Sequence, residues 1–218
     1  MKMRRALCGV GVVAMLGLGA GCAHDGSRAA RQEGEKVGKA FAERAHFTDQ
    51  LARLDQEQIA LGRLALERTQ DREVRLFAEN LIRDHEQHLA QLRSMADEKA
   101  FSLSMFDLSA DSATGGAGLD GAVEGMRKEE KKNDKRSDKQ MRKFLERRDE
   151  LASLSGRDFD RAFIDQVKSD QERGEELARD GLDEYRNDTR LALLLSRSAP
   201  IYHIHQQQAA TLKGFIGD

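Results

Sequence analysis

The chain has 218 residues, with 36 Lys and Arg against 38 Asp and Glu, a 34% charged fraction, one Pro and no Trp. This composition is typical of helices with solvated outer faces, so it argues against a β-sandwich or a nucleotide-binding sheet. The net charge of -2 also argues against a nucleic-acid-binding protein, because that affinity needs clustered, uncompensated cations.

The first 22 residues have the layout of a bacterial secretory signal. A basic start precedes an apolar stretch over residues 6–18, which ends in small residues directly before Cys22. The stretch is too short and too Gly-rich to favour a membrane-spanning helix, which needs about 20 apolar residues. We therefore expect residues 1–21 to be a signal peptide that is removed from the mature chain.

The three small residues 19–21 before Cys22 resemble the lipobox of bacterial lipoproteins, in which the cysteine is lipidated and becomes the new N-terminus. The alternative is an ordinary signal peptide with an incidental cysteine, since Leu18 stands one place earlier than the Leu of the usual pattern. Cys22 is the predicted lipid anchor and would be the only thiol of the mature chain. Ala23 stands where an Asp would mark retention in the inner membrane. We therefore expect the chain to be anchored in the outer membrane and to face the periplasm.

The segment after the anchor, residues 22–40, is polar and rich in Gly, Ala and charge, with no apolar period. It is predicted to be a flexible tether to a helical domain over residues 41–214. Apolar residues at helical spacing predict helices at about 42–68 and 72–98, with Asp71 as the N-cap of the second.

An insert over residues 105–150 interrupts this pattern. Residues 107–122 are rich in Gly, Ala, Ser and Asp, and predict a loop or disordered segment. Residues 127–150 hold 11 basic and 7 acidic side chains, which favours a solvated helix or a disordered stretch. Their excess positive charge could also contact anionic lipid headgroups or glycans, although the interspersed acids weaken this idea.

The apolar period returns after the insert and predicts a helix at about 158–186 and another after residue 189, which Pro200 breaks or kinks. The predicted fold is all-α. Four long helices with a charged insert between the second and the third are most simply arranged as an up-and-down four-helix bundle.

The chain resembles the bacterial envelope family called domain of unknown function 4142, over about residues 42–214. The motifs that carry the resemblance are Glu57, Leu61-Gly62, Leu64-Ala65, Asp84-His85, the segment 155–160, Pro200 and His205. The resemblance implies a ferritin-like bundle in an exported lipoprotein or outer-membrane protein. Members usually carry a second Asp-His pair in the third helix, and here that pair reads Asp170-Gln171.

Metal binding is the alternative that these motifs raise. Ferritin-like di-iron sites need paired Glu-x-x-His motifs, and the only one here runs from Glu43 to His46 at the start of a helix. A single transition metal could still be held by His85 and His205 on inward stripes; the nearby carboxylates are Glu57, Asp84 and Asp170.

The competing interpretation is that His85 and His205 are buried side chains hydrogen-bonded to each other, to Gln171 or to carboxylates. We favour this interpretation, because Gln171 is a poor ligand where a third imidazole is expected. His88 and His203 are interpreted as surface neighbours.

No catalytic constellation stands out in the sequence. The sequence therefore predicts a non-enzymatic envelope lipoprotein with a structural, stress-related or partner-binding role and no cofactor. The membrane would be contacted through the lipid, and the further partner would be an envelope protein or an anionic surface. The alternative is a metal-binding or redox protein.

Overall fold

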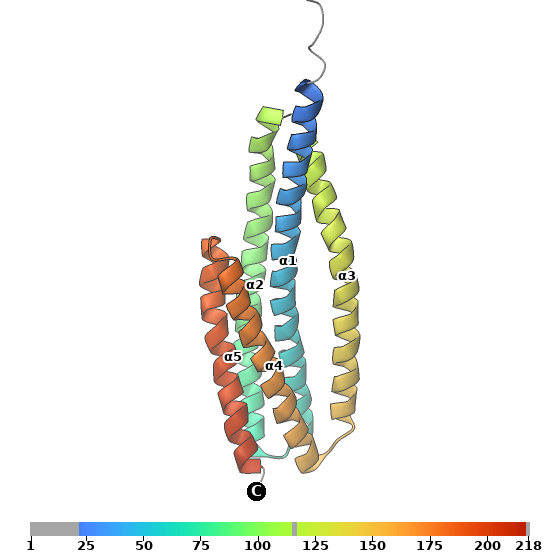
Figure 1. Ribbon diagram of the computed structural model, residues 1–218. Helices are drawn as coiled ribbons and strands as arrows, with labels where there is room; N and C mark the ends of the chain where they lie inside the picture. The colour runs from blue at the N-terminus through green and yellow to red at the C-terminus, as the bar shows by residue number, and fades with distance from the viewer. Residues whose placement is uncertain (1–21, 115–116, 217–218) are drawn as a thin grey trace, which may run out of the picture.

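The computed structural model describes residues 22–114 and 117–216, and within these ranges every regular element is an α-helix. The helices are α1 (Cys22–Arg68), α2 (Arg72–Thr114), α3 (Ala117–Ala152), α4 (Gly156–Glu184) and α5 (Thr189–Ile216). They alternate in direction along the chain, as Figure 1 shows. The prediction of an all-α helical bundle is therefore confirmed, with five helices rather than four. No described helix has a stretch long and apolar enough to cross a membrane.

Short polar segments separate the helices. The carboxylate of Asp71 accepts the backbone N–H groups of Glu73 at 2.8 Å and Val74 at 3.1 Å, which confirms it as the N-cap of α2. Asp188 likewise accepts the N–H of Leu191 at 3.1 Å and caps α5. Gly156 has a φ of 57°, a left-handed conformation that suits glycine, at the tight turn into α4.

The helices differ in length, and this sets the shape of the molecule. The 47 residues of α1 extend about 70 Å, whereas the 29 residues of α4 extend about 44 Å. Figure 1 shows α4 and α5 beside the lower part of α1 and α2, and α3 along the other side of α1. The lower part of the bundle is therefore the one that four inward-facing helices enclose.

Two predictions of irregular structure were wrong. Residues 22–40 belong to α1, and residues 107–114 and 117–122 are helical rather than a loop; residues 115–116 lie outside the described residues. Residues 127–150 form a helix, which is one of the two alternatives predicted for them. The two predictions failed because α1 and α3 pack through small residues, which give no apolar period. A Cβ atom on Gly38 would collide with the carbonyl oxygen of Ala122, and one on Gly125 would collide with that of Glu35.

Charged and polar side chains of α3 also form direct contacts with α1. Lys128 contacts Glu35 at 2.7 Å, Arg31 contacts Glu124 at 2.5 Å, and Arg53 donates to the hydroxyl of Ser137 at 2.7 Å. The charged segment is therefore a helix laid along α1, in which part of the charge is paired across the helix–helix contact.

Candidate functional site

A layer of buried polar side chains crosses the lower bundle between two apolar clusters. On α1, α2 and α4 the polar positions lie between residues of one cluster and residues of the other, whereas on α5 Tyr202 belongs to one of the clusters itself. The polar residues are Asp55 and Gln58 on α1, His85 and His88 on α2, Asp170 and Gln171 on α4, and Ser198, Tyr202 and His205 on α5. This layer is the candidate functional site.

Asp55 is the centre of the layer, and its side chain has no exposed surface. One carboxylate oxygen lies 2.7 Å from Nδ1 of His85, and the other lies 2.9 Å from Nδ1 of His88. The hydroxyl of Tyr202 donates to it at 3.4 Å. Burial and the neighbouring Asp55 carboxylate raise the pKa of Tyr202 well above its ordinary value, so the phenol keeps its proton and acts as a donor.

A chain of amides leads from His85 toward the surface. The amide nitrogen of Gln171 lies 3.1 Å from Nε2 of His85 and also donates to Oε1 of Gln58 at 3.0 Å. The amide of Gln58 donates to Asp170 at 3.1 Å, and Arg173 contacts the same carboxylate at 3.1 Å. Because Gln171 donates to Nε2 of His85, the geometry assigns the proton of this imidazole to Nδ1, where Asp55 accepts it.

His88 lies between Asp55 and Ser198, whose Oγ is 2.6 Å from Nε2 of the imidazole. These distances are those of a Ser-His-Asp catalytic triad. However, the Ser198 hydroxyl donates its one proton to the carbonyl of Leu194 at 2.9 Å rather than to His88, and the serine side chain has no exposed surface. A substrate could reach this serine only if the helices separated. In this structure the three side chains instead join α1, α2 and α5 to one another.

His205 extends the layer toward one side. Its ring stacks on that of His85 with centroids 5.5 Å apart, and its Nδ1 lies 3.1 Å from Oε1 of Gln208. Its buried Nε2 has no hydrogen-bond partner but lies 3.3 Å from a carboxylate oxygen of Asp84. Burial, with a smaller contribution from His85, lowers the pKa of His205 to about 4. The imidazole is therefore neutral at neutral pH, and the contact with Asp84 is not an ion pair there.

The structure brings only some of the predicted ligand residues together. His85, His205 and Asp84 lie near one another, whereas Glu57 and Asp170 contact Arg173, at 3.3 and 3.1 Å. Burial raises the pKa of Glu57, while Arg173 acts in the opposite direction. Among the described residues, no three His, Cys, Asp or Glu side chains converge to hold a metal ion. Metal binding stays a prediction, as does lipidation of Cys22, the first residue of α1.

The sequence did not lead us to predict the residues at the centre of the layer. His88 was interpreted as a surface residue, and this is wrong, because its side chain has no exposed surface; His203 is 47% exposed, as expected. Asp55 and Ser198 were not singled out at all. A signal was present: His85 and His88 are three residues apart, which places both on one face of α2, and Asp55 lies on the buried stripe of α1 between Leu51 and Gln58.

These features define a long all-helical bundle whose four enclosing helices share a sealed histidine–aspartate layer. The family model for the domain of unknown function DUF4142 matches residues 29–212, and the chain belongs to this family. No curated protein and no solved structure matches the chain. The resemblance read from the sequence is therefore confirmed at the level of the family.

We expect replacement of Asp55 by Asn to destabilise the protein strongly. The substitution replaces one of the two carboxylate oxygens that contact Nδ1 of His85 and Nδ1 of His88 by an NH2 donor, and breaking a buried pair of this kind costs about 3–5 kcal/mol. Asp165→Asn is the matched control, because Asp165 is 50% exposed in its ion pair with Lys213 and its loss costs about 1 kcal/mol or less. Urea unfolding measures both, and equal losses would contradict a central role for Asp55.

The low pKa of His205 makes stability depend on pH. The native imidazole titrates at about 4, against an ordinary value of 6.5 in the unfolded chain. Between these pH values the unfolded chain binds a proton that the native state does not. The free energy of unfolding therefore has its full contribution from neutral His205 above pH 6.5, and it falls as the pH drops toward 4. The expected loss is about 3 kcal/mol. Unfolding across this range should show a shallower slope for His205→Gln; an identical slope would exclude His205 as the source.

Proposed function

We propose that this protein is a lipid-anchored lipoprotein of the bacterial cell envelope whose bundle acts as a non-enzymatic binding module. Its partner would dock on the groove between α2 and α5. The observation that carries this proposal is a contrast: the titratable cluster is sealed inside the bundle, whereas large apolar side chains are exposed along one groove.

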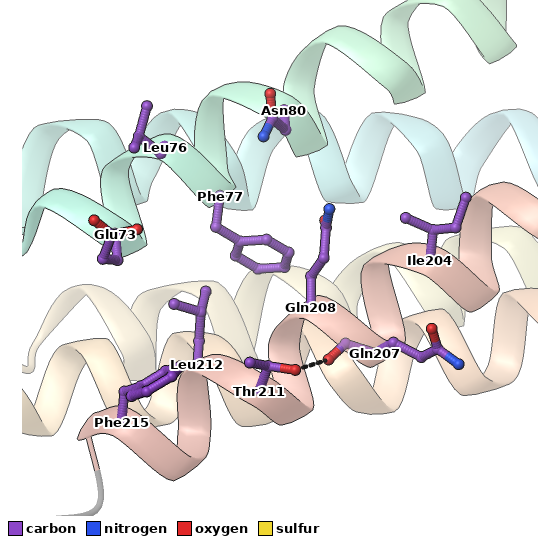
Figure 2. A pocket seen from close by; sticks show the side chains of 10 residues that line it. All are labelled: Glu73, Leu76, Phe77, Asn80, Ile204, Gln207, Gln208, Thr211, Leu212 and Phe215. Carbon is purple, nitrogen blue, oxygen red and sulfur yellow. Dashed lines mark hydrogen bonds between the residues drawn. The ribbon is translucent and has the colours of Figure 1, made fainter.

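The groove has a volume of about 750 Å³ and lies on the outer side of α2 and α5, as Figure 2 shows. Leu76 on α2 is 44% exposed, and Ile204 and Phe215 on α5 are 50% and 76% exposed. They are three of the eight exposed large apolar side chains in the described part of the chain, and all three line this one groove. Exposed apolar side chains that gather in a groove mark interaction sites.

The shape and the chemistry of the groove fit an amphipathic helix of a partner protein. Two antiparallel helices form its walls, and a third helix can pack between such walls with apolar side chains at positions i, i+3, i+4 and i+7. Asn80, Gln207 and Thr211 supply uncharged polar groups at the groove. Uncharged groups can both donate and accept hydrogen bonds, and they set no requirement for a strongly charged partner.

The anchor belongs to the proposal because of the signal-like segment that ends at Cys22. The groove lies near the end of α1 that is remote from Cys22, as the positions of α2 and α5 in Figure 1 indicate. At 1.5 Å per residue, α1 would hold the groove about 60–70 Å from the anchor. A partner could then be met well away from the membrane surface.

Photo-crosslinking in the cells that make the protein tests this proposal. A photoactivatable residue in place of Ile204 or Phe215 should give a discrete adduct in the membrane fraction, because the partner covers these side chains. Val123 on α3 is the control position, since it is 52% exposed but lies outside the groove. Equal adducts from Val123, or none from the groove, would contradict the proposal. An adduct of twice the chain mass would identify a second copy as the partner.

A second candidate function, metal binding, is favoured by the buried Nε2 of His205, which has no hydrogen-bond partner and lies beside Asp84 and His85. Elemental analysis of the full chain, purified without added metal or chelator, separates the two candidates. Our proposal expects no stoichiometric metal. A near-stoichiometric metal that a His85→Ala, His205→Ala variant loses would replace it with metal binding.

A further inference from the structure

A second pocket, of about 330 Å³, lies where α1, α3 and α4 meet. It is separate from the α2–α5 groove and adjoins the buried polar layer through Arg173, which contacts Asp170 at 3.1 Å. Four cationic side chains line it, namely Arg53 from α1, Lys143 and Arg147 from α3, and Arg173 from α4. Among the described side chains, Glu57 is the one acidic group on its wall. The cations therefore exceed the acids on the pocket wall.

The helical spacing of α3 creates one wall of this pocket. Gln140, Lys143 and Arg147 are three and four residues apart, which places them on one face of the helix. Lys143 and Arg147 thereby line the same pocket as Arg53 and Arg173 from the facing helices. Cations from three helices converge on one small volume, an arrangement that repels itself unless an anion is present.

The local counter-ions do not satisfy these cations fully. Arg173 contacts both Glu57, at 3.3 Å, and Asp170, at 3.1 Å. The nearest guanidinium nitrogen of Arg147 is 4.0 Å from Glu57, too long for a hydrogen bond. The Nε–H of Arg147 is buried and has no hydrogen-bond partner. An unpartnered guanidinium N–H out of contact with water is unfavourable, and a small shift of this side chain, which is 36% exposed, would bring the N–H to an oxygen acceptor in the pocket.

We infer that this pocket binds a phosphate group of a soluble ligand. Guanidinium groups bind phosphate oxygens with paired, charge-assisted hydrogen bonds, and several cations around one centre suit an anion with more than one charge. A dianion also remains attracted when Glu57 is ionised, whereas a carboxylate with one charge gains less. The volume of about 330 Å³ is at the lower end of small-ligand sites, which fits a phosphate and a small part of the molecule that carries it.

The position of the pocket favours a soluble phosphate over a lipid headgroup, and this step alone depends on the proposed anchor. Arg53 follows Cys22 by 31 residues of continuous α-helix. The pocket is therefore about 45 Å from the anchor along α1. Headgroups of the membrane that holds the anchor are out of reach when α1 stands away from the bilayer.

Calorimetric titration of pyrophosphate into the full chain, in non-ionic detergent and phosphate-free buffer, tests the inference. We expect saturable binding at one site that weakens about tenfold or more in Arg147→Gln and in Lys143→Gln. Arg148→Gln is the matched control: it removes the same charge from the neighbouring residue, which pairs with Asp149 at 2.7 Å and does not line the pocket. Its affinity should stay within about twofold of the original chain.

A gain of affinity gives a second, independent readout. Glu57→Gln removes the one carboxylate that faces the ligand, so pyrophosphate should bind more tightly. This result cannot come from a damaged fold, which would only weaken binding. The absence of saturable binding at millimolar pyrophosphate would overturn the inference. Equal weakening in Arg147→Gln and Arg148→Gln would also overturn it, because it would show attraction to the charge of α3 as a whole.

The same titration in micelles that contain phosphatidylglycerol distinguishes the source of the phosphate. Unchanged pyrophosphate affinity supports a soluble ligand. If phosphatidylglycerol headgroups occupied the pocket, they would compete with pyrophosphate. The pyrophosphate affinity of the original chain and of Arg148→Gln would then fall in these micelles, whereas that of Arg147→Gln would not. This result would keep the pocket but overturn the soluble source of the phosphate.

Discussion

The carboxylate of Asp55 is the interaction on which the lower bundle depends. It lies without exposed surface between His85 and His88, with Tyr202 as a third donor, and so joins α1 to α2 and α5. Removing a carboxylate from water is costly, and only a full set of well-placed donors offsets this cost. The layer therefore contributes less to raw stability than to the choice of one arrangement over others. A slip of α2 by one residue would move both imidazoles by 1.5 Å along the axis and about 100° around it, out of reach of Asp55.

The apolar clusters on either side make this choice effective. Apolar side chains tolerate shifted contacts, because their attraction is not directional. Hydrogen bonds within the layer do not tolerate such shifts, and the apolar clusters keep water from replacing them. The two kinds of contact thus have different roles. The apolar clusters hold the helices together, and the polar layer sets their register. This accounts for a buried Ser-His-Asp arrangement that has catalytic distances without catalytic access.

How much of this could be predicted from the sequence differs from element to element. The helical period and Asp71 predicted the end of α1, the start of α2, both ends of α4 and the start of α5 closely, because apolar stripes and caps are local signals. The helix α2 continues to Thr114, well beyond its predicted end at about residue 98. The start of α1 and most of α3 escaped prediction, since Gly38, Gly121 and Gly125 pack by close backbone approach and show no apolar period. His85 and His205 were placed inward correctly. His88 was not, although it shares a face of α2 with His85, because its partners Asp55 and Ser198 are 33 and 110 residues away in the chain.

The helix α3 gives the molecule a second kind of surface. Its charges at the upper end pair with α1, as Lys128 does with Glu35. Toward the lower end, Lys143 and Arg147 face a pocket in which positive charge is in excess. A solvated helix alone would not give Arg147 a buried Nε–H without a partner. A helix held against α1 by small residues, with Lys143 and Arg147 on the wall of a pocket, is better explained as one side of an anion site, separate from the apolar groove on the α2–α5 side.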